Sequence, residues 1–131
     1  MLGAYIGRPY RDDACGPQAF DCKGLVRAVQ RAVWGREVPP LAGTWLAWRS
    51  ACRGAGWAPT DAPPAAGDVL LVRAIDGPHV GVFVRAGRRL MVLHARSRLR
   101  RGVQAGRVEL HALADLLAGG YTRPQVWRHG E

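Results

Sequence analysis

The sequence predicts an α+β fold in which N-terminal helices pack on a small antiparallel sheet. Apolar residues of the first half recur at helical spacing, whereas the second half has short runs rich in valine and leucine between glycine, proline and aspartate. The proline- and alanine-rich residues 58–67 connect the two halves. Because helices precede strands along the chain, the class is α+β. With 131 residues, we expect residues 1–131 to form a single domain.

Two helices are expected before the connector. Asp21 can cap the first helix and Gly35 can end it. The apolar positions of this helix are Leu25, Val26, Val29, Ala32 and Val33. The second helix is expected over residues 41–53, because the glycines in residues 54–56 can end it. Cys22 would then lie in the first turn of the first helix.

Three strands are expected after the connector. They are Asp68–Arg73, His79–Arg85 and Arg89–Ala95. A turn centred on Ala86-Gly87 would pair residues whose numbers sum to 173, which places His79 directly opposite His94. Opposed residues share a face with β-carbons about 4.5 to 5.5 Å apart, so the two imidazoles would meet. A slip of one residue would separate them.

The remainder of the chain is expected to extend the sheet. The expected elements are a strand at Val108–Leu110, a short helix at His111–Ala118 and an extended segment at Pro124–Trp127. His111 and His129 lie in weakly patterned segments, so we interpret both as surface residues outside any site.

Composition and charge exclude several classes of protein. With 48% apolar and 22% charged residues, the chain can bury a core and is not disordered. No apolar run approaches the roughly 20 residues of a membrane span, and no signal peptide is readable at the start. The net charge of +9 favours an anionic partner, which could be nucleic acid, a cell-wall polymer or an acidic protein surface.

The cysteines and histidines suggest nucleophilic chemistry. A cysteine in the first turn of a helix meets unpaired N–H groups, which lower a thiol pKa, and Cys22 has this place. The register offers His79 as a base and His94 as its orienting group. The alternatives are that Cys22 is a buried apolar residue and that His94 only bonds the backbone. Cys15 and Cys52 are interpreted as structural or incidental, since three cysteines without a C-x-x-C pair indicate neither a zinc site nor a disulfide scaffold.

Several stretches, in this order, resemble the NlpC-type cell-wall cysteine peptidases. They are Gly7-Arg-Pro-Tyr10, Phe20-Asp-Cys-Lys-Gly-Leu-Val26, Gly67-Asp-Val-Leu-Leu71, His79-Val-Gly-Val-Phe83 and Leu93-His-Ala95. The resemblance spans nearly the whole chain. It implies a papain-like fold without metal or organic cofactor, and hydrolysis of the bond between a D-γ-glutamyl residue and a diamino acid in peptidoglycan stem peptides.

The resemblance also implies roles for individual residues. Cys22 would be the nucleophile, His79 the general base and acid, and His94 the orienting residue. Tyr10 would line the site near the oxyanion and Asp21 would face the end of the stem peptide, although Asp21 is also explained as a helix cap. Many bacterial members have serine directly after the cysteine, where this chain has Lys23, so recognition of a free amino end is in question.

Two further stretches resemble the small peptidases of phage tails and phage-like particles. They are Gly-Arg-Pro-Tyr-Arg near the start and Gly-Tyr-Thr-Arg-Pro124 near the end. This resemblance implies a virion tail as the location, phage-tail or baseplate proteins as partners, and action on the periplasmic cell wall. The alternatives are a structural tail-tip component with the same fold and an exported effector that degrades cell walls.

The arginines form a run directly after His94. They are Arg96, Arg98, Arg100 and Arg101, with Arg88-Arg89 at the hairpin. One interpretation is a solvated face, and the other is attraction to the anionic wall or to an acidic tail protein. Nucleic acid is not expected as a partner, because aromatic residues do not alternate with these arginines.

Overall fold

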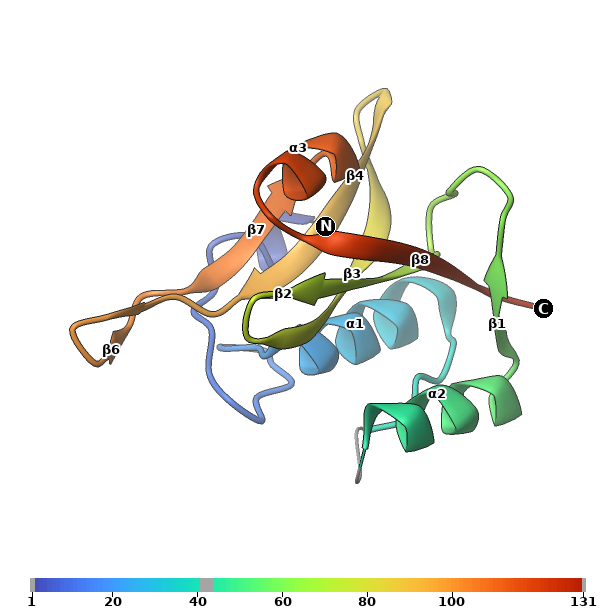
Figure 1. Ribbon diagram of the computed structural model, residues 1–131, viewed down its shortest axis with the longest axis horizontal. Helices are drawn as coiled ribbons and strands as arrows, with labels where there is room; N and C mark the ends of the chain where they lie inside the picture. The colour runs from blue at the N-terminus through green and yellow to red at the C-terminus, as the bar shows by residue number, and fades with distance from the viewer. Residues whose placement is uncertain (1, 41–43, 131) are drawn as a thin grey trace.

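The computed structural model describes residues 2–40 and 44–130, which form a six-stranded sheet with helices on both faces (Figure 1). The strand order is β1-β8-β2-β3-β4-β7, and every neighbouring pair is antiparallel. The strands are β1 (Trp57–Thr60), β2 (Val69–Ala74), β3 (Gly77–Ala86), β4 (Arg89–Arg96), β7 (Arg107–His111) and β8 (Thr122–His129). The expected α+β class with an antiparallel sheet is confirmed.

The first helix, α1 (Cys22–Val29), begins and ends as its sequence predicts. The Asp21 carboxylate accepts the N–H of Gly24 at 2.6 Å, which caps the helix. The chain continues through a π-helical turn (Gln30–Trp34) and stops at Gly35, whose φ of 63° is the left-handed conformation that glycine tolerates best. Cys22 is therefore the first residue of α1.

The second helix, α2 (Trp45–Gly54), confirms the expected helix over residues 45–53 and ends one residue later. Residues 41–43 of the expected helix lie outside the described residues. The helix begins at Trp45 because Thr44 caps it, with its hydroxyl accepting the N–H of Ala47 at 3.1 Å.

The prediction of a connector is wrong at residues 58–60, which belong to the edge strand β1. β1 pairs with β8 on one side only. Pro59 obscured the strand in the sequence, because a proline cannot donate to a sheet. An edge strand tolerates it, since one side of its backbone needs no partner.

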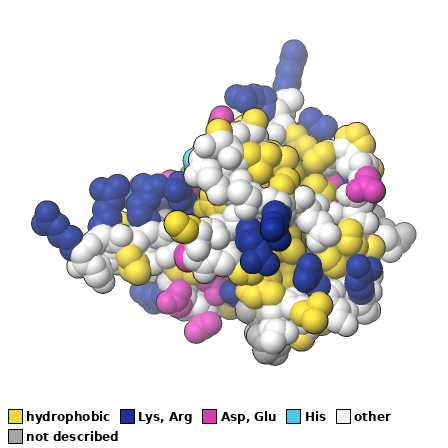
Figure 2. All heavy atoms as spheres, in the orientation of Figure 1, with side chains coloured by type: hydrophobic (Ala, Val, Ile, Leu, Met, Phe, Trp, Pro, Cys, Tyr) yellow, Lys and Arg dark blue, Asp and Glu magenta, His cyan; other side chains and the backbone are white. Residues whose placement is uncertain are grey.

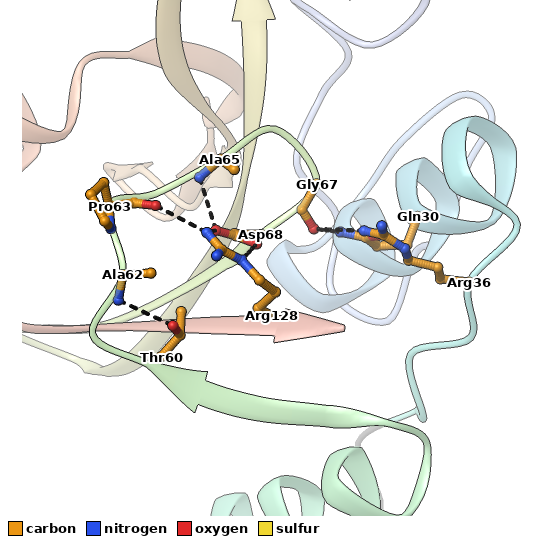
Figure 3. Close-up of polar contacts among 9 residues, drawn as sticks. All are labelled: Gln30, Arg36, Thr60, Ala62, Pro63, Ala65, Gly67, Asp68 and Arg128. Atoms are coloured by element: carbon orange, nitrogen blue, oxygen red, sulfur yellow. Dashed lines mark hydrogen bonds and ion pairs between the residues drawn. The ribbon is translucent and has the colours of Figure 1, made fainter. Parts of the chain in front are cut away.

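The Gly67-Asp68 pair fixes the rest of the connector (Figure 3). The buried carboxylate of Asp68 accepts Arg128 Nε at 3.0 Å, Arg128 Nη2 at 2.8 Å and the N–H of Ala65 at 2.9 Å. The carbonyl of Gly67 accepts the side-chain amide of the fully buried Gln30 at 2.7 Å. The connector is therefore joined to β8 through Asp68 and to the end of α1 through Gly67.

The β3–β4 hairpin has a different register from the expected one. The paired residues have numbers that sum to 175, as in Phe83 with Val92 and Ala86 with Arg89, so the turn is Gly87-Arg88. Gly87 has a φ of 63°, which such a tight turn requires. The prediction that His79 lies directly opposite His94 is wrong by two positions. An even shift leaves both residues on the same face, since side chains alternate along a strand.

The segment after β4 departs most from the expectation. A two-stranded arm, β5 (Leu99–Arg100) with β6 (Val103–Gln104), projects from the sheet (Figure 1). β7 then pairs with β4 and extends through His111, so His111 is the last residue of a strand and not the first of a helix. The helix α3 (Leu113–Ala118) begins two residues later.

Each face of the sheet has its own apolar core. On one face, α1 and α2 pack through Leu25, Val26, Val29, Trp48 and Cys52 against strand residues such as Val80, Val82, Leu93 and Val108. On the other face, Leu116 of α3 packs with Leu70, Val72, Phe83 and Val92. The sheet is thus held between helices (Figure 1). No helix in the described part of the chain has the length and hydropathy needed to cross a bilayer.

Candidate active site

Cys22 begins α1 and is buried, close to the loop that precedes the helix. Only 7% of its surface is exposed. Gly24 permits this placement, because a β-carbon there would collide with the carbonyl of Ala14. The backbone N–H of Val80, the residue after His79, faces the sulfur and lowers its pKa. The fold therefore brings the start of α1 to the start of β3, where His79 lies.

The pKa of Cys22 is raised, contrary to the sequence prediction. Burial is the largest cause, and the charge of Asp21 adds to it. The positive charge of Lys23 and the N–H groups of Val80 and Lys23 act in the predicted direction, but they do not offset burial. The thiol therefore rests in its neutral form.

His79 and His94 meet as the sequence predicts, although by a diagonal contact. His79 Nε2 lies 2.9 Å from His94 Nδ1, and the rings are edge to face with centroids 5.1 Å apart. The contact leaves Nδ1 as the free nitrogen of His79. Burial lowers the pKa of His79 to about 4 and that of His94 to about 3. Both rings are therefore neutral at pH 7, and no hydrogen bond joins the Cys22 thiol to the His79 ring within residues 2–40 and 44–130.

Two residues that sequence reasoning left out of the site contact these histidines. His111 Nδ1 lies 2.9 Å from His94 Nε2, so three imidazoles form a row across β3, β4 and β7. Tyr121, which follows α3, stacks on the ring of His79 with centroids 5.1 Å apart and an interplanar angle of 28°. Tyr121 stands in the quoted Gly-Tyr-Thr-Arg-Pro stretch, which was its only signal. His111 had none, because the pairing of β4 with β7 joins segments that the arm separates.

Tyr10 lies beside Cys22. It forms an isolated bridge with Phe20, two residues before Cys22, and donates its backbone N–H to Gly106. The pKa of Tyr10 is raised, first by burial and then by the charges of Cys22 and Asp12. The phenol therefore keeps its hydrogen, and the Asp12 carboxylate accepts a hydrogen bond from it.

Asp21 points its carboxylate into the protein. One oxygen accepts the N–H of Gly24 and the other accepts the N–H of Asp13 at 3.0 Å. The residue is 6% exposed. These contacts account for a cap that also holds the preceding loop, and contact with a substrate stays a prediction.

One group in the described residues has the composition of a metal site. Ligand atoms of His94, Glu109 and His111 lie within 4.8 Å of one another. The two facing nitrogens are 2.9 Å apart, whereas nitrogens that share a tetrahedral zinc ion at its usual bond length stand about 3.3 Å apart. The observed spacing is that of a hydrogen bond, so these rings form a hydrogen-bonded network.

A groove of about 600 Å³ runs beside the site. Its lining includes Trp45, Arg49, Arg73, Pro78 and Arg123. Pro78 directly precedes His79, and the ammonium of Lys23 lies 5.4 Å from the ring centroid of Trp45. The groove therefore approaches the site from the side of α2, with guanidinium groups along it.

A second hollow, of about 360 Å³, lies at the base of the β5–β6 arm. It is lined by Arg96, Arg98, Arg100, Ala105, Gly106, Arg107 and Glu109. Figure 2 shows Lys and Arg side chains gathered over this arm, at the left of the view. The arginine run is thus displayed on a projecting surface near the row of histidines.

Comparison with known proteins identifies the family. Residues 7–127 match the model of the NlpC/P60 family. No curated protein matches the chain. The crystal structure of the NlpC/p60 domain of the peptidoglycan hydrolase SagA is similar, with a TM-score of 0.56 and 23% identity over 96% of this chain and 90% of that one. This likeness shows a shared fold.

A second solved structure is more distant. It is an N-acetylmuramoyl-L-alanine amidase from Bacteroides uniformis ATCC 8492, with a TM-score of 0.48 and 11% identity over 97% of this chain and 96% of that one.

Proposed function

The chain belongs to the NlpC/P60 family, and we propose that it hydrolyses peptidoglycan stem peptides with Cys22 as the nucleophile, His79 as the base and acid, and His94 as the orienting residue. The likeness to the domain of a peptidoglycan hydrolase supports this proposal. One observation carries the residue assignment. The contact of His79 Nε2 with His94 Nδ1 leaves His79 Nδ1 as the nitrogen free to exchange a proton with a thiol.

The first half of the reaction is acyl transfer to sulfur. His79 Nδ1 takes the proton of the Cys22 thiol as the sulfur attacks the scissile carbonyl carbon. The tetrahedral intermediate then collapses, and His79 gives the proton to the nitrogen of the departing diamino acid. The products of this half are a free amine and a thioester on Cys22.

Hydrolysis of the thioester completes the cycle. His79 Nδ1 takes a proton from a water molecule that attacks the thioester carbonyl, and returns it to the sulfur as the carbon–sulfur bond breaks. The peptide leaves as a carboxylic acid, and both Cys22 and His79 are again neutral. Their neutral resting state agrees with the raised pKa of Cys22 and the lowered pKa of His79.

The oxyanion can be stabilised from two sides of the sulfur. The N–H of Cys22 lies in the first turn of α1, where backbone donors have no partner inside the helix. The phenol of Tyr10 keeps its hydrogen and lies near the sulfur. We assign Tyr10 to the oxyanion on this basis, as a donor that exchanges the Asp12 carboxylate for the oxyanion.

We further propose the D-γ-glutamyl–diamino acid bond as the scissile bond. A D-glutamyl residue that is joined through its γ-carboxyl keeps its α-carboxylate beside this bond. The groove beside His79 presents Arg49, Arg73 and Arg123, which complement such a ligand in charge. Lys23 stands over Trp45 at the start of this groove, so the place of the usual serine is held by a cation.

We place the enzyme on a phage or phage-like tail that acts on the periplasmic cell wall, with tail or baseplate proteins as partners. The Gly-Arg-Pro-Tyr-Arg and Gly-Tyr-Thr-Arg-Pro stretches support this placement. The arginines of the β5–β6 arm would attract the anionic wall or an acidic tail protein.

The proposal is tested by mass spectrometry of defined muropeptides incubated with the wild type and with Cys22→Ala. New fragments with the wild type alone would identify both the nucleophile and the bond. If neither protein forms a product while both are folded, a structural tail-tip role replaces hydrolysis. If the wild type cleaves the muropeptides and its gene lies in a cluster for toxin export, the exported effector is favoured instead.

A further inference from the structure

The row of three histidines has a direction. His94 contacts His79 through Nδ1 and His111 through Nε2, both at 2.9 Å, and no part of His94 is exposed. A neutral imidazole has one N–H donor and one acceptor nitrogen. His94 therefore donates to one neighbour and accepts from the other, so the tautomer at one end of the row determines the tautomer at the other end.

Only one direction permits the proposed reaction, on which this inference rests. His79 can take a proton at Nδ1 only when its own hydrogen is on Nε2, where it donates to His94 Nδ1. The hydrogen of His94 must then be on Nε2, and it needs an acceptor. His111 Nδ1 is the atom at hydrogen-bond distance from it. In the reverse direction, His79 would present an N–H to the thiol and could not act as its base.

We propose that His111 is a positioning residue, which accepts the N–H of His94 and thereby holds His79 in the tautomer that the reaction needs. Burial makes this acceptor necessary, because bulk water does not reach the His94 ring. If His111 lost its acceptor, the hydrogen of His94 would have no partner on Nε2. It would move to Nδ1, where His79 Nε2 can accept it.

The surroundings of His111 fit this role. The register pairs His111 with Val92 and Glu109 with His94, so His111 reaches His94 diagonally from the end of β7. A carboxylate oxygen of Glu109 lies within 4.8 Å of ring nitrogens of both His94 and His111. A carboxylate therefore lies beside the His94–His111 end of the row.

Charges from other elements also face the row. Arg96 of β4 lies 3.9 Å from Glu109 Oε1 and lowers the pKa of both His79 and His94. Lys23 of α1 also lowers the pKa of His79, whereas Asp76 raises it. Tyr121 stacks on His79 and has its edge toward His94, with centroids 6.2 Å apart. Burial is the main cause that lowers the pKa of His94, followed by His79, His111 and Arg96, so His94 stays neutral, as the directional argument requires.

The direct test is the tautomer of each ring by ¹⁵N NMR of the full chain at neutral pH. The chain has only four histidines, so single replacements assign every imidazole. We expect the Nε2–H tautomer at His79 and His94 in the wild type. We expect it also in His111→Asn, whose side-chain oxygen can replace Nδ1 as an acceptor. His111→Leu should shift His94 toward Nδ1–H, and His129→Gln should leave the three rings unchanged.

The kinetic test separates positioning from folding. His111→Leu should lower kcat by about 10- to 100-fold, as expected for loss of a group that orients a functional histidine, with KM little changed. His111→Asn should recover most of kcat. Nδ1–H tautomers at His79 and His94 in the wild type would overturn the proposal, as would a His111→Leu protein with unchanged tautomers and unchanged kcat.

The tautomers are measured without any substrate, so the two proposals can fail separately. If the wild type cleaves no muropeptide but its tautomers are as expected and depend on residue 111, the positioning role stands and the assigned reaction falls. If the wild type cleaves muropeptides but residue 111 affects neither tautomers nor kcat, the positioning role falls and the reaction stands.

Discussion

Gly81 lies against His94 so closely that a β-carbon on Gly81 would stand 3.2 Å from the β-carbon of His94. The same β-carbon would stand 2.7 Å from Cγ1 of Val92 and 3.1 Å from the carbonyl of Leu93. The register of the hairpin brings Gly81 to this place, two residues after His79. The glycine of the His-Val-Gly stretch therefore makes room for the diagonal contact between the two histidines.

Gly81→Ala should displace His94 and destabilise the hairpin. We expect a loss of about 1–3 kcal/mol in the free energy of unfolding, as for other overpacked cores, and a lower kcat on muropeptides. Urea unfolding and steady-state kinetics measure both. Gly54→Ala is the matched control, because a β-carbon there meets no atom within 4 Å. Equal behaviour of the two variants would contradict the role of Gly81.

The pH dependence of activity should have an unusually low acid limb. Burial lowers the pKa of His79 to about 4, and protonated His79 has no nitrogen to accept the thiol proton. We expect kcat/KM to stay level from pH 7 to about pH 5 and to fall about tenfold per pH unit below about pH 4. Arg96→Gln should move this fall in kcat/KM to a higher pH, since the arginine lowers the pKa of His79. A limb near pH 6.5 in the wild type would show that His79 is solvated.

Acid should also destabilise the fold through the histidines. His79 and His94 bind protons near pH 6.5 in the unfolded chain but only near pH 4 and pH 3 in the folded protein. Between these values the unfolded chain binds more protons, so the free energy of unfolding falls as the pH falls, by about 1.4 kcal/mol per pH unit for each histidine. Above pH 6.5 this contribution is constant. Urea unfolding at pH 7, 6 and 5 should show a shallower slope for His94→Asn than for the wild type.

Asp68 should contribute to stability and not to chemistry. Its buried carboxylate accepts two hydrogen bonds from Arg128 and one from Ala65. Asp68→Asn should lower the free energy of unfolding by about 1–3 kcal/mol, because a buried group loses its charged partner. Glu37→Gln is the control: Glu37 pairs with Arg31 at 2.9 Å in solvent, and we expect no measurable change in its urea midpoint. Equal shifts for the two variants would exclude a special role of the Asp68 contact.

The arginines of the β5–β6 arm should matter for the intact wall and not for the cleavage itself. Replacing Arg98, Arg100 and Arg101 with glutamine should slow digestion of purified cell wall more than cleavage of a small soluble muropeptide, because only the wall is a polyanion. Turbidity and chromatography measure the two rates. The control replaces Arg85, Arg88 and Arg89 with glutamine, which removes the same charge. These arginines lie near the β3–β4 turn, away from the arm (Figure 1). An equal loss on both substrates would argue against docking.

The sequence predicted the elements that depend on neighbouring residues. Asp21 and Gly35 mark the ends of the helical segment because capping and the left-handed stop are local interactions. The strands β2, β3 and β4 lie close to their expected positions because each run is apolar and bounded by turn residues. His79 and His94 share a face for any register that differs by an even number. The α+β class and the shared face of these two histidines were therefore determined by the sequence.

The tertiary structure decided what depends on residues far apart in the chain. Local patterns do not identify the pairing partners of a strand. Three features follow from such partners: the β3–β4 register, in which paired residue numbers sum to 175 instead of 173, the strand at 57–60, and the extension of β7 through His111. The pKa of Cys22 also has the opposite direction from the prediction. A helix start lowers a thiol pKa locally, but burial of the sulfur, which depends on tertiary packing, outweighs it. The sequence thus predicted which residues would carry the chemistry, and packing determined their partners and their protonation.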